Sequence, residues 1–254
     1  PDRPYSTYLI ERRYNEPCSS FSVIASLTGY TPYRYTDFGV FPDKYSYCYR
    51  MKNVNFCSNE SEYSNESCTI LLTGESTQFS NRLFWTSYEG WAGDVANYSL
   101  ERGSESNGFS FAQIAMNPAS VYAFEDFTIS TKGGLNSYRI LATEGPGGLN
   151  ATSSSNQTEL IQSPLVYIPN AFTPNGDDRN NTWSPGFSFV REIEISVFNR
   201  WGQQIFFTKS PEGSWDGKFD GRECPEGVYA YLIRYTGYDK NDRYQRTGSV
   251  TLIR

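Results

Sequence analysis

The chain has 254 residues and a net charge of −6, and it contains no histidine and no cluster of lysine and arginine. The missing basic patch excludes a nucleic-acid-binding footprint, and no apolar run approaches the ~20 residues of a membrane span. Without histidine, Ser-His-Asp and Cys-His catalysis and histidine-containing zinc sites are excluded as well. Catalysis by a pair of carboxylates stays open, but the carboxylates fall in predicted turns and strand edges, so we expect no enzyme.

Aromatic residues make up 17% of the chain, and 21 glycines and 13 prolines supply turn signals. Aromatic and β-branched residues fit a pleated, half-buried surface, and the turn residues divide the chain into short segments. Together they predict an all-β protein. The chain starts at Pro1 without a signal peptide, so we expect a fragment of a longer secreted protein.

Residues 1–166 contain an internal repeat with a period of about 90 residues. It is seen in Tyr8-Leu9-Ile10-Glu11-Arg12 and Tyr98-Ser99-Leu100-Glu101-Arg102, in Asp37-Phe38 and Asp126-Phe127, and in Tyr49-Arg50 and Tyr138-Arg139. Such a period suits a tandem β-sandwich domain. In the second copy, apolar residues alternate as in strands buried on one face, at Leu83/Trp85, Tyr98/Leu100, Phe109/Phe111 and Tyr138/Ile140/Ala142.

These blocks, together with Leu83-Phe84-Trp85 and Gly90-Trp91, resemble tandem fibronectin type III domains of large Bacteroidetes surface proteins. The resemblance implies two immunoglobulin-like or fibronectin type III-like β-sandwiches, at residues 1–70 and 71–166. Only seven residues precede Tyr8, so we expect the opening strands of the first copy to be missing.

Trp85 and Trp91 allow two interpretations. Either side chain can pack in the core of a sandwich, which is the common role of a tryptophan in such a domain. Alternatively, one of them forms a platform on which a sugar ring stacks, as in accessory modules of polysaccharide-degrading enzymes. Trp91 lies in a glycine-rich loop and is the better candidate for that role.

The repeat alignment predicts a disulfide between Cys48 and Cys68. It places Cys48 opposite Ser137 and Cys68 opposite Glu159, so the second copy lacks both cysteines together. The segments 45–54 and 64–72 also read as the two arms of a hairpin, which brings the two positions face to face. Cys18 and Cys57 are a possible second pair, although they should lie toward opposite ends of the sandwich, and Cys224 has no partner in its own domain.

Residues 167–254 differ in character and predict a small C-terminal β-sandwich. Ile193, Ile195 and Val197 alternate with polar residues, which indicates a strand buried on one face. Residues 228–235 are apolar at nearly every position, which predicts a strand covered on both faces. Val250 and Leu252 mark the last strand.

Five motifs of this segment occur in the order of a known family. They are 167–180 (Tyr-Ile-Pro-Asn-Ala-Phe-Thr-Pro-Asn-Gly-Asp-Asp-Arg-Asn), 197–202 (Val-Phe-Asn-Arg-Trp-Gly), 215–218 (Trp-Asp-Gly-Lys), 225–231 (Pro-Glu-Gly-Val-Tyr-Ala-Tyr) and 248–254 (Gly-Ser-Val-Thr-Leu-Ile-Arg). They resemble the type B C-terminal sorting domain of the type IX secretion system, also described as the gliding-motility-associated C-terminal domain. Asp178 stands where the family often has glycine.

The resemblance implies a secreted, outer-membrane-associated cell-surface protein, most simply an adhesin linked to gliding motility. One alternative is the export tail of a secreted polysaccharide-degrading or other hydrolytic enzyme, and another is a purely structural stalk. The implied partners are the secretion machinery and an outer-membrane β-barrel of the PorP/SprF family. We expect the final strand to supply the contact, through Val250, Thr251, Leu252, Ile253 and Arg254, because an edge strand offers unpaired backbone groups.

One loop of the C-terminal segment offers oxygen ligands for calcium, from Asn175, Asp177, Asp178 and Asn180. It lacks the terminal glutamate of an EF-hand, and Arg179 adds a competing positive charge. Asn and Asp also cap and turn the backbone without any metal. Both interpretations stay open, and no other cofactor is expected.

Overall fold

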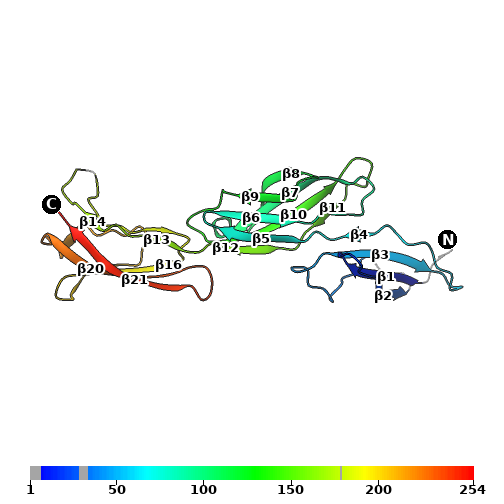
Figure 1. Cartoon of the computed structure of the whole chain (residues 1–254), viewed down its shortest axis with the longest axis horizontal. Helices are drawn as coiled ribbons and strands as arrows, with labels where there is room; N and C mark the ends of the chain where they lie inside the picture. Colours follow the sequence, from blue (N-terminus) through cyan, green and yellow to red (C-terminus); the bar gives the residue numbers. More distant parts are fainter. Residues whose placement is uncertain (1–6, 29–33, 178) are drawn as a thin grey trace. The chain divides into compact units, whose positions relative to one another are not determined.

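The computed structural model describes residues 7–28, 34–177 and 179–254 and consists of β-strands with one 3-10 turn, Glu105–Asn107 (Figure 1). This confirms the all-β prediction. In the described part of the chain, no helix combines the length and apolarity needed to cross a bilayer. The chain forms two compact units, Pro1–Glu75 with Asn81–Asp126 and Ser137–Leu160, and Ser76–Ser80 with Phe127–Asn136 and Ile161–Arg254.

The first repeat copy forms one antiparallel sheet in the order β2-β1-β3-β4. Its strands are β1 (Thr7–Tyr14), β2 (Ser22–Thr28), β3 (Tyr47–Val54) and β4 (Ser67–Cys68).

The second copy is a sandwich of two sheets. One sheet runs β11-β10-β7-β8, with β12 also paired to β10, and the other runs β5-β6-β9. The strands are β5 (Leu72–Thr77), β6 (Ser80–Trp85), β7 (Val95–Ser104), β8 (Ala112–Pro118), β9 (Ala123–Asp126), β10 (Leu135–Glu144), β11 (Thr152–Ser154) and β12 (Thr158–Ile161). Their core joins Leu83 and Trp85 of one sheet to Leu100 and Ile140 of the other, as the alternation predicted.

The sequence repeat is also a structural repeat, down to its irregularities. Strand pairing shifts by one residue between Ile10 and Glu11 of β1, and again between Leu100 and Glu101 of β7. A bulge of this kind bends a strand locally. The two copies therefore have the same local strand geometry as well as the same sequence pattern.

The same polar network recurs in both copies. Glu11 pairs with Arg50, whose guanidinium lies 3.9 Å from the Phe21 ring centroid, and Glu101 pairs with Arg139, 4.3 Å from that of Phe111. A second network joins Arg12, Asp37 and Tyr49, and its counterpart joins Arg102, Asp126 and Tyr138. The glutamate–arginine pairs join neighbouring strands of one sheet, whereas Asp126 of β9 ties its sheet to β7 and β10 of the other.

One expected strand of the second copy is wrong. Phe109 and Phe111 precede β8, and Phe109 has a positive φ of 60°. The 3-10 turn Glu105–Asn107 and the left-handed Gly108 turn the chain here, so the alternation of the two phenylalanines belongs to a loop. Phe111 lies beside the Arg139 guanidinium instead of lying in a strand.

The C-terminal segment forms a five-stranded sheet in the order β14-β21-β20-β16-β17. Its strands are β14 (Ala171–Phe172), β16 (Glu192–Phe198), β17 (Gln204–Thr208), β20 (Gly227–Thr236) and β21 (Arg243–Leu252). Two small ladders accompany it, β13 (Leu165–Tyr167) with β15 (Gly186–Ser188) and β18 (Lys218–Phe219) with β19 (Arg222–Glu223).

The expectation that residues 228–235 are covered on both faces is wrong. Tyr229, Ile233 and Tyr235 are buried, whereas Val228 and Arg234 are exposed. The core lies against one face of the sheet, so the apolar residues on the other face of β20 meet solvent.

Candidate functional site

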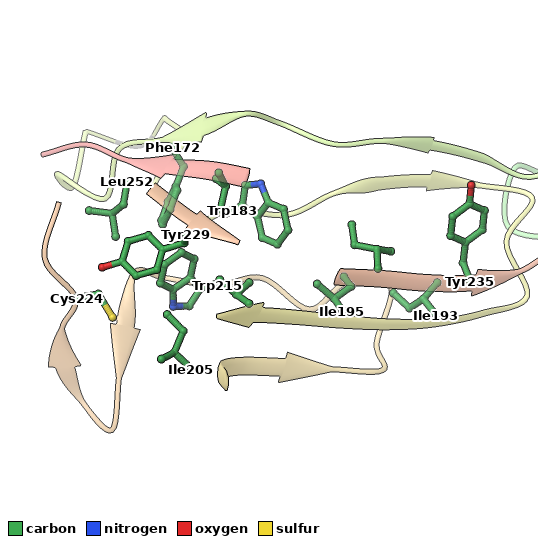
Figure 2. Close-up of a cluster of buried hydrophobic side chains, with 13 residues drawn as sticks. Phe172, Trp183, Ile193, Ile195, Ile205, Trp215, Cys224, Tyr229, Tyr235 and Leu252 are labelled. Atoms are coloured by element: carbon green, nitrogen blue, oxygen red, sulfur yellow. The ribbon is translucent and has the colours of Figure 1, made fainter. Parts of the chain in front are cut away.

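The C-terminal domain has a hydrophobic core of its own, centred on two tryptophans (Figure 2). Trp183 and Trp215 are fully buried, and their backbones exchange two hydrogen bonds of 2.8 and 2.9 Å. Each indole N–H is satisfied, by the carbonyls of Pro169 and Lys218. Tyr229 packs edge-on against Trp215, with ring centroids 4.9 Å apart. The motif at 215–218 is therefore a core anchor followed by a tight turn.

The motif at 197–202 shapes a hairpin tip that exposes a tryptophan. The Asn199 side-chain oxygen accepts hydrogen bonds from the backbone N–H groups of Trp201 and Gln203, and Gly202 adopts a φ of 79°. Trp201 is 76% exposed, and the Arg200 guanidinium lies 4.5 Å from its ring centroid. The hairpin tip lines one side of a cavity of about 310 Å³, which is also lined by Phe219, Arg222 and Cys224.

Arg254 forms hydrogen bonds with two residues that line this cavity. The Arg254 backbone N–H donates to the Glu226 carboxylate at 2.7 Å, and its guanidinium donates to the Cys224 carbonyl at 2.6 Å. Cys224 is a buried free thiol, and burial raises its pKa. A thiol with a raised pKa is a poor nucleophile at neutral pH, which fits a packing role.

The predicted contact segment at the C-terminus is largely engaged inside the domain. Val250 and Leu252 are fully buried, and the N–H groups of Thr251 and Ile253 donate to the carbonyls of Asn170 and Phe172. Strand β14 thus pairs in parallel with this end of β21. The unpaired edge on which the expectation rested does not lie at residues 251–253, and partner binding there stays a prediction.

The open edge lies upstream in the same strand. Residues 243–249 are exposed and pair only with β20 among the described strands, in a register without a shift. The N–H groups of Thr251 and Ile253 point away from β20. Backbone N–H groups point to alternate sides along a strand, so the N–H groups of Gln245, Thr247 and Ser249 also point away from β20. The sequence did not reveal this edge, because it does not show that the short β14 pairs with only the last residues of β21.

The predicted calcium loop is a network of turns in the structure. The Asn175 side-chain oxygen accepts from the Asp177 N–H at 3.2 Å, and the Asp177 carboxylate accepts from the Arg179 N–H at 3.0 Å. Asn180 lies at a φ of 52°, and Asp178 lies outside the described residues. The loop atoms act as Asx turns, and calcium binding remains a prediction.

The predicted disulfide between Cys48 and Cys68 is confirmed. The two cysteines are direct partners across β3 and β4. Cys18 and Cys57 are both free and exposed. Cys18 follows β1 at its Tyr14 end, and Cys57 follows β3 at the opposite end of the same sheet, so the possible second pair does not form.

The tryptophans of the second copy have different roles. Trp85 is buried in the core, whereas Trp91 is half-buried and lines a cavity of about 280 Å³ together with Tyr88 and Tyr122. Trp85 therefore follows the packing interpretation. Trp91 packs against the same core and also lines the cavity, and its role as a sugar platform stays a prediction.

No curated protein matches the chain. Among solved structures, a tetra-tandem repeat from the extending region of a large adhesion protein overlaps 98% of this chain and 67% of its own, at 12% identity and a TM-score of 0.37. Fibronectin(III)-like modules of Clostridium thermocellum CbhA overlap 72% and 93%, at 11% identity and a TM-score of 0.26. The FN1–FN3 domains of chicken CNTN1 overlap 99% and 90%, also at 11% identity and 0.26.

The C-terminal domain, over residues 166–252, matches the family model described as the CHU_C type IX secretion signal domain.

Proposed function

We propose that this chain belongs to a cell-surface adhesin of gliding motility, whose C-terminal domain directs export and then holds the protein at the outer membrane. The family match over residues 166–252 carries the proposal. It indicates an exported protein, either secreted or at the cell surface. Tandem sandwiches joined to such a signal suit a surface adhesin, because they extend a binding surface outward without a catalytic centre of their own.

The C-terminal domain has the properties of a folded recognition tag. All thirteen buried residues of its core lie from Phe172 to Leu252, and the two tryptophan N–H groups donate to the carbonyls of Pro169 and Lys218, so core and acceptors fall within residues 169–252. A core that is complete within one segment allows that segment to fold on its own. A fusion can therefore test the tag apart from the repeats.

The export test joins residues 161–254 to a fluorescent protein behind a signal peptide in a host with a type IX system. We expect fluorescence at the cell surface, whereas a fusion of residues 71–160 stays in the periplasm. Retention of the folded C-terminal fusion in the periplasm would contradict the export role.

The adhesin role has a separate test. Removing the gene from a gliding host should reduce attachment and spreading while leaving polysaccharide hydrolysis unchanged. Normal attachment with lost hydrolysis would instead identify the tail of a secreted hydrolase.

The proposed partner is an outer-membrane β-barrel of the PorP/SprF family, and the open edge of β21 supports a contact by strand addition. The outward N–H and C=O groups of Gln245, Thr247 and Ser249 are available to an extended segment. Arg243 and Arg246 flank these groups and favour an acidic segment.

A matched pair of proline variants tests this contact. Thr247→Pro removes an outward N–H and should abolish co-purification with the barrel while changing the melting temperature little. Arg246→Pro removes an N–H that faces β20, so it should lower the melting temperature. Unchanged co-purification of a folded Thr247→Pro variant would rule out strand addition at this edge.

A further inference from the structure

We infer that the second sandwich carries a binding site for neutral sugar residues, at the cavity beside the loop that bears Trp91. The cavity has a volume of about 280 Å³. Four aromatic rings and two carboxylates line it, from Tyr88, Trp91, Tyr98, Tyr122, Glu89 and Asp94. This inference gives the proposed adhesin a class of ligand and to that extent rests on the proposed function, although binding by the purified chain is measured independently of export.

The rings offer the apolar part of the site. The Tyr88 and Trp91 rings pack against each other with centroids 4.0 Å apart and planes tilted by 38°, and Tyr122 lies edge-on to Tyr98 at 5.9 Å. Trp91 is half-buried and Tyr122 is 42% exposed, so the rings are held in place and still reach solvent. The negative face of an aromatic ring attracts the polarised C–H groups on one face of a sugar ring.

The loop that carries these rings is fixed at several points. The Tyr88 N–H donates to the Tyr98 hydroxyl at 2.9 Å, and the Cys68 N–H donates to the Glu89 carbonyl at 3.0 Å. Gly90 has a φ of 121°, and a Cβ there would lie 2.6 Å from the Glu66 carbonyl oxygen. A loop held in this way loses little conformational freedom when a ligand binds, which favours affinity.

The charges around the cavity select for neutral ligands. Glu89 and Asp94 can accept hydrogen bonds from sugar hydroxyls, and no lysine or arginine of the described residues lines the cavity. Uronic acids and sulfated sugars would meet two carboxylates without a compensating cation, which disfavours them. The volume is near the lower end of ligand pockets, about 300 Å³, so we expect one sugar unit of a longer chain to occupy it.

The test is affinity electrophoresis of the full chain in gels that contain galactomannan, hydroxyethylcellulose or dextran, with alginate as the acidic polymer. We expect at least one neutral polymer to retard the chain and alginate to have no effect. Trp91→Ala and Tyr122→Ala should each weaken retardation at least tenfold. Phe84→Ala removes an exposed ring of the same sandwich that does not line the cavity and should bind like the unmodified chain.

Folding and binding are separated by measuring the melting temperature of each variant. The Tyr122 ring lies at the surface, so Tyr122→Ala should keep the fold even if Trp91→Ala does not. The proposal is overturned if no neutral polymer retards the chain, if folded Tyr122→Ala is retarded as strongly as the unmodified chain, or if alginate is the preferred polymer. Export of the fusion would be unaffected by any of these results.

Discussion

At the residue scale, both copies of the repeat contain the same polar network, but its aspartate is more deeply buried in the second copy. In the second copy, the Asp126 carboxylate accepts from Arg102 at 2.6 Å and from the Tyr138 hydroxyl at 2.8 Å, and its side chain is 1% exposed. In the first copy, Asp37 makes the equivalent bonds to Arg12 and Tyr49 but is 11% exposed. Burial also raises the pKa of Tyr138, so its hydroxyl stays protonated and donates to Asp126.

This difference predicts unequal effects of matched variants. Asp126→Ala removes the carboxylate that the buried Tyr138 hydroxyl and the Arg102 guanidinium both use, and it should lower the free energy of unfolding by about 3 kcal/mol. Asp37→Ala should cost less, because water can replace the lost carboxylate more easily. Denaturant unfolding of both variants measures the two values, and equal losses would contradict the argument from burial.

A single substitution also tests whether the loop around Asp177 binds calcium. If the loop around Asp177 binds Ca²⁺, removing the ion with EGTA should lower the melting temperature of the chain, because a ligand of the native state stabilises it. Asp177→Ala should then abolish the EGTA effect. If the loop is only capped by its own side chains, Asp177→Ala should lower the melting temperature equally with and without EGTA.

At the element scale, the pairing of β3 with β4 decides the cross-link of the first copy. The disulfide closes a loop with a sequence separation of 20 between Cys48 and Cys68. The chain-entropy model assigns a closure of this size about 3 kcal/mol. Few other residues of this sheet are buried, so the cross-link is a large part of its stability.

We therefore expect the double variant Cys48→Ser, Cys68→Ser to unfold the first copy at a clearly lower temperature. The matched control is Cys18→Ser, Cys57→Ser, which removes two exposed free thiols and should leave the melting temperature unchanged. Peptide mapping without reductant checks the linkage itself. A control that destabilises as much as the double variant would point to a different pairing in solution.

At the scale of the whole molecule, the second copy and the C-terminal domain have separate hydrophobic cores. Trp215 belongs to the C-terminal core, so Trp215→Ala should lower the stability of that domain by about 3–5 kcal/mol. In calorimetry, we expect the transition of the C-terminal domain to move while that of the second copy stays in place. A parallel shift of all transitions would show that the cores unfold together.

Much of this architecture could be read from the sequence because it depends on local patterns. Alternation at Tyr138, Ile140 and Ala142 follows from the two-residue period of a strand, and all three side chains are fully buried. The pairing of Cys48 with Cys68 followed from the repeat and a hairpin of nearby segments. The motif at 215–218 predicted a turn and, with four other motifs, a resemblance to a known family, whereas the burial of Trp215 in the core was seen only in the structure.

Only the tertiary structure decided which surfaces are open. The edge at Thr251 is closed by Asn170, a partner far away in the sequence, whereas Thr247 on the same strand has no such neighbour among the described residues. The apolar run of β20 likewise does not reveal that one of its faces lacks a covering layer. A local pattern fixes which face of a strand is apolar, but whether a face or an edge is covered depends on contacts between distant segments, which only the folded chain brings together.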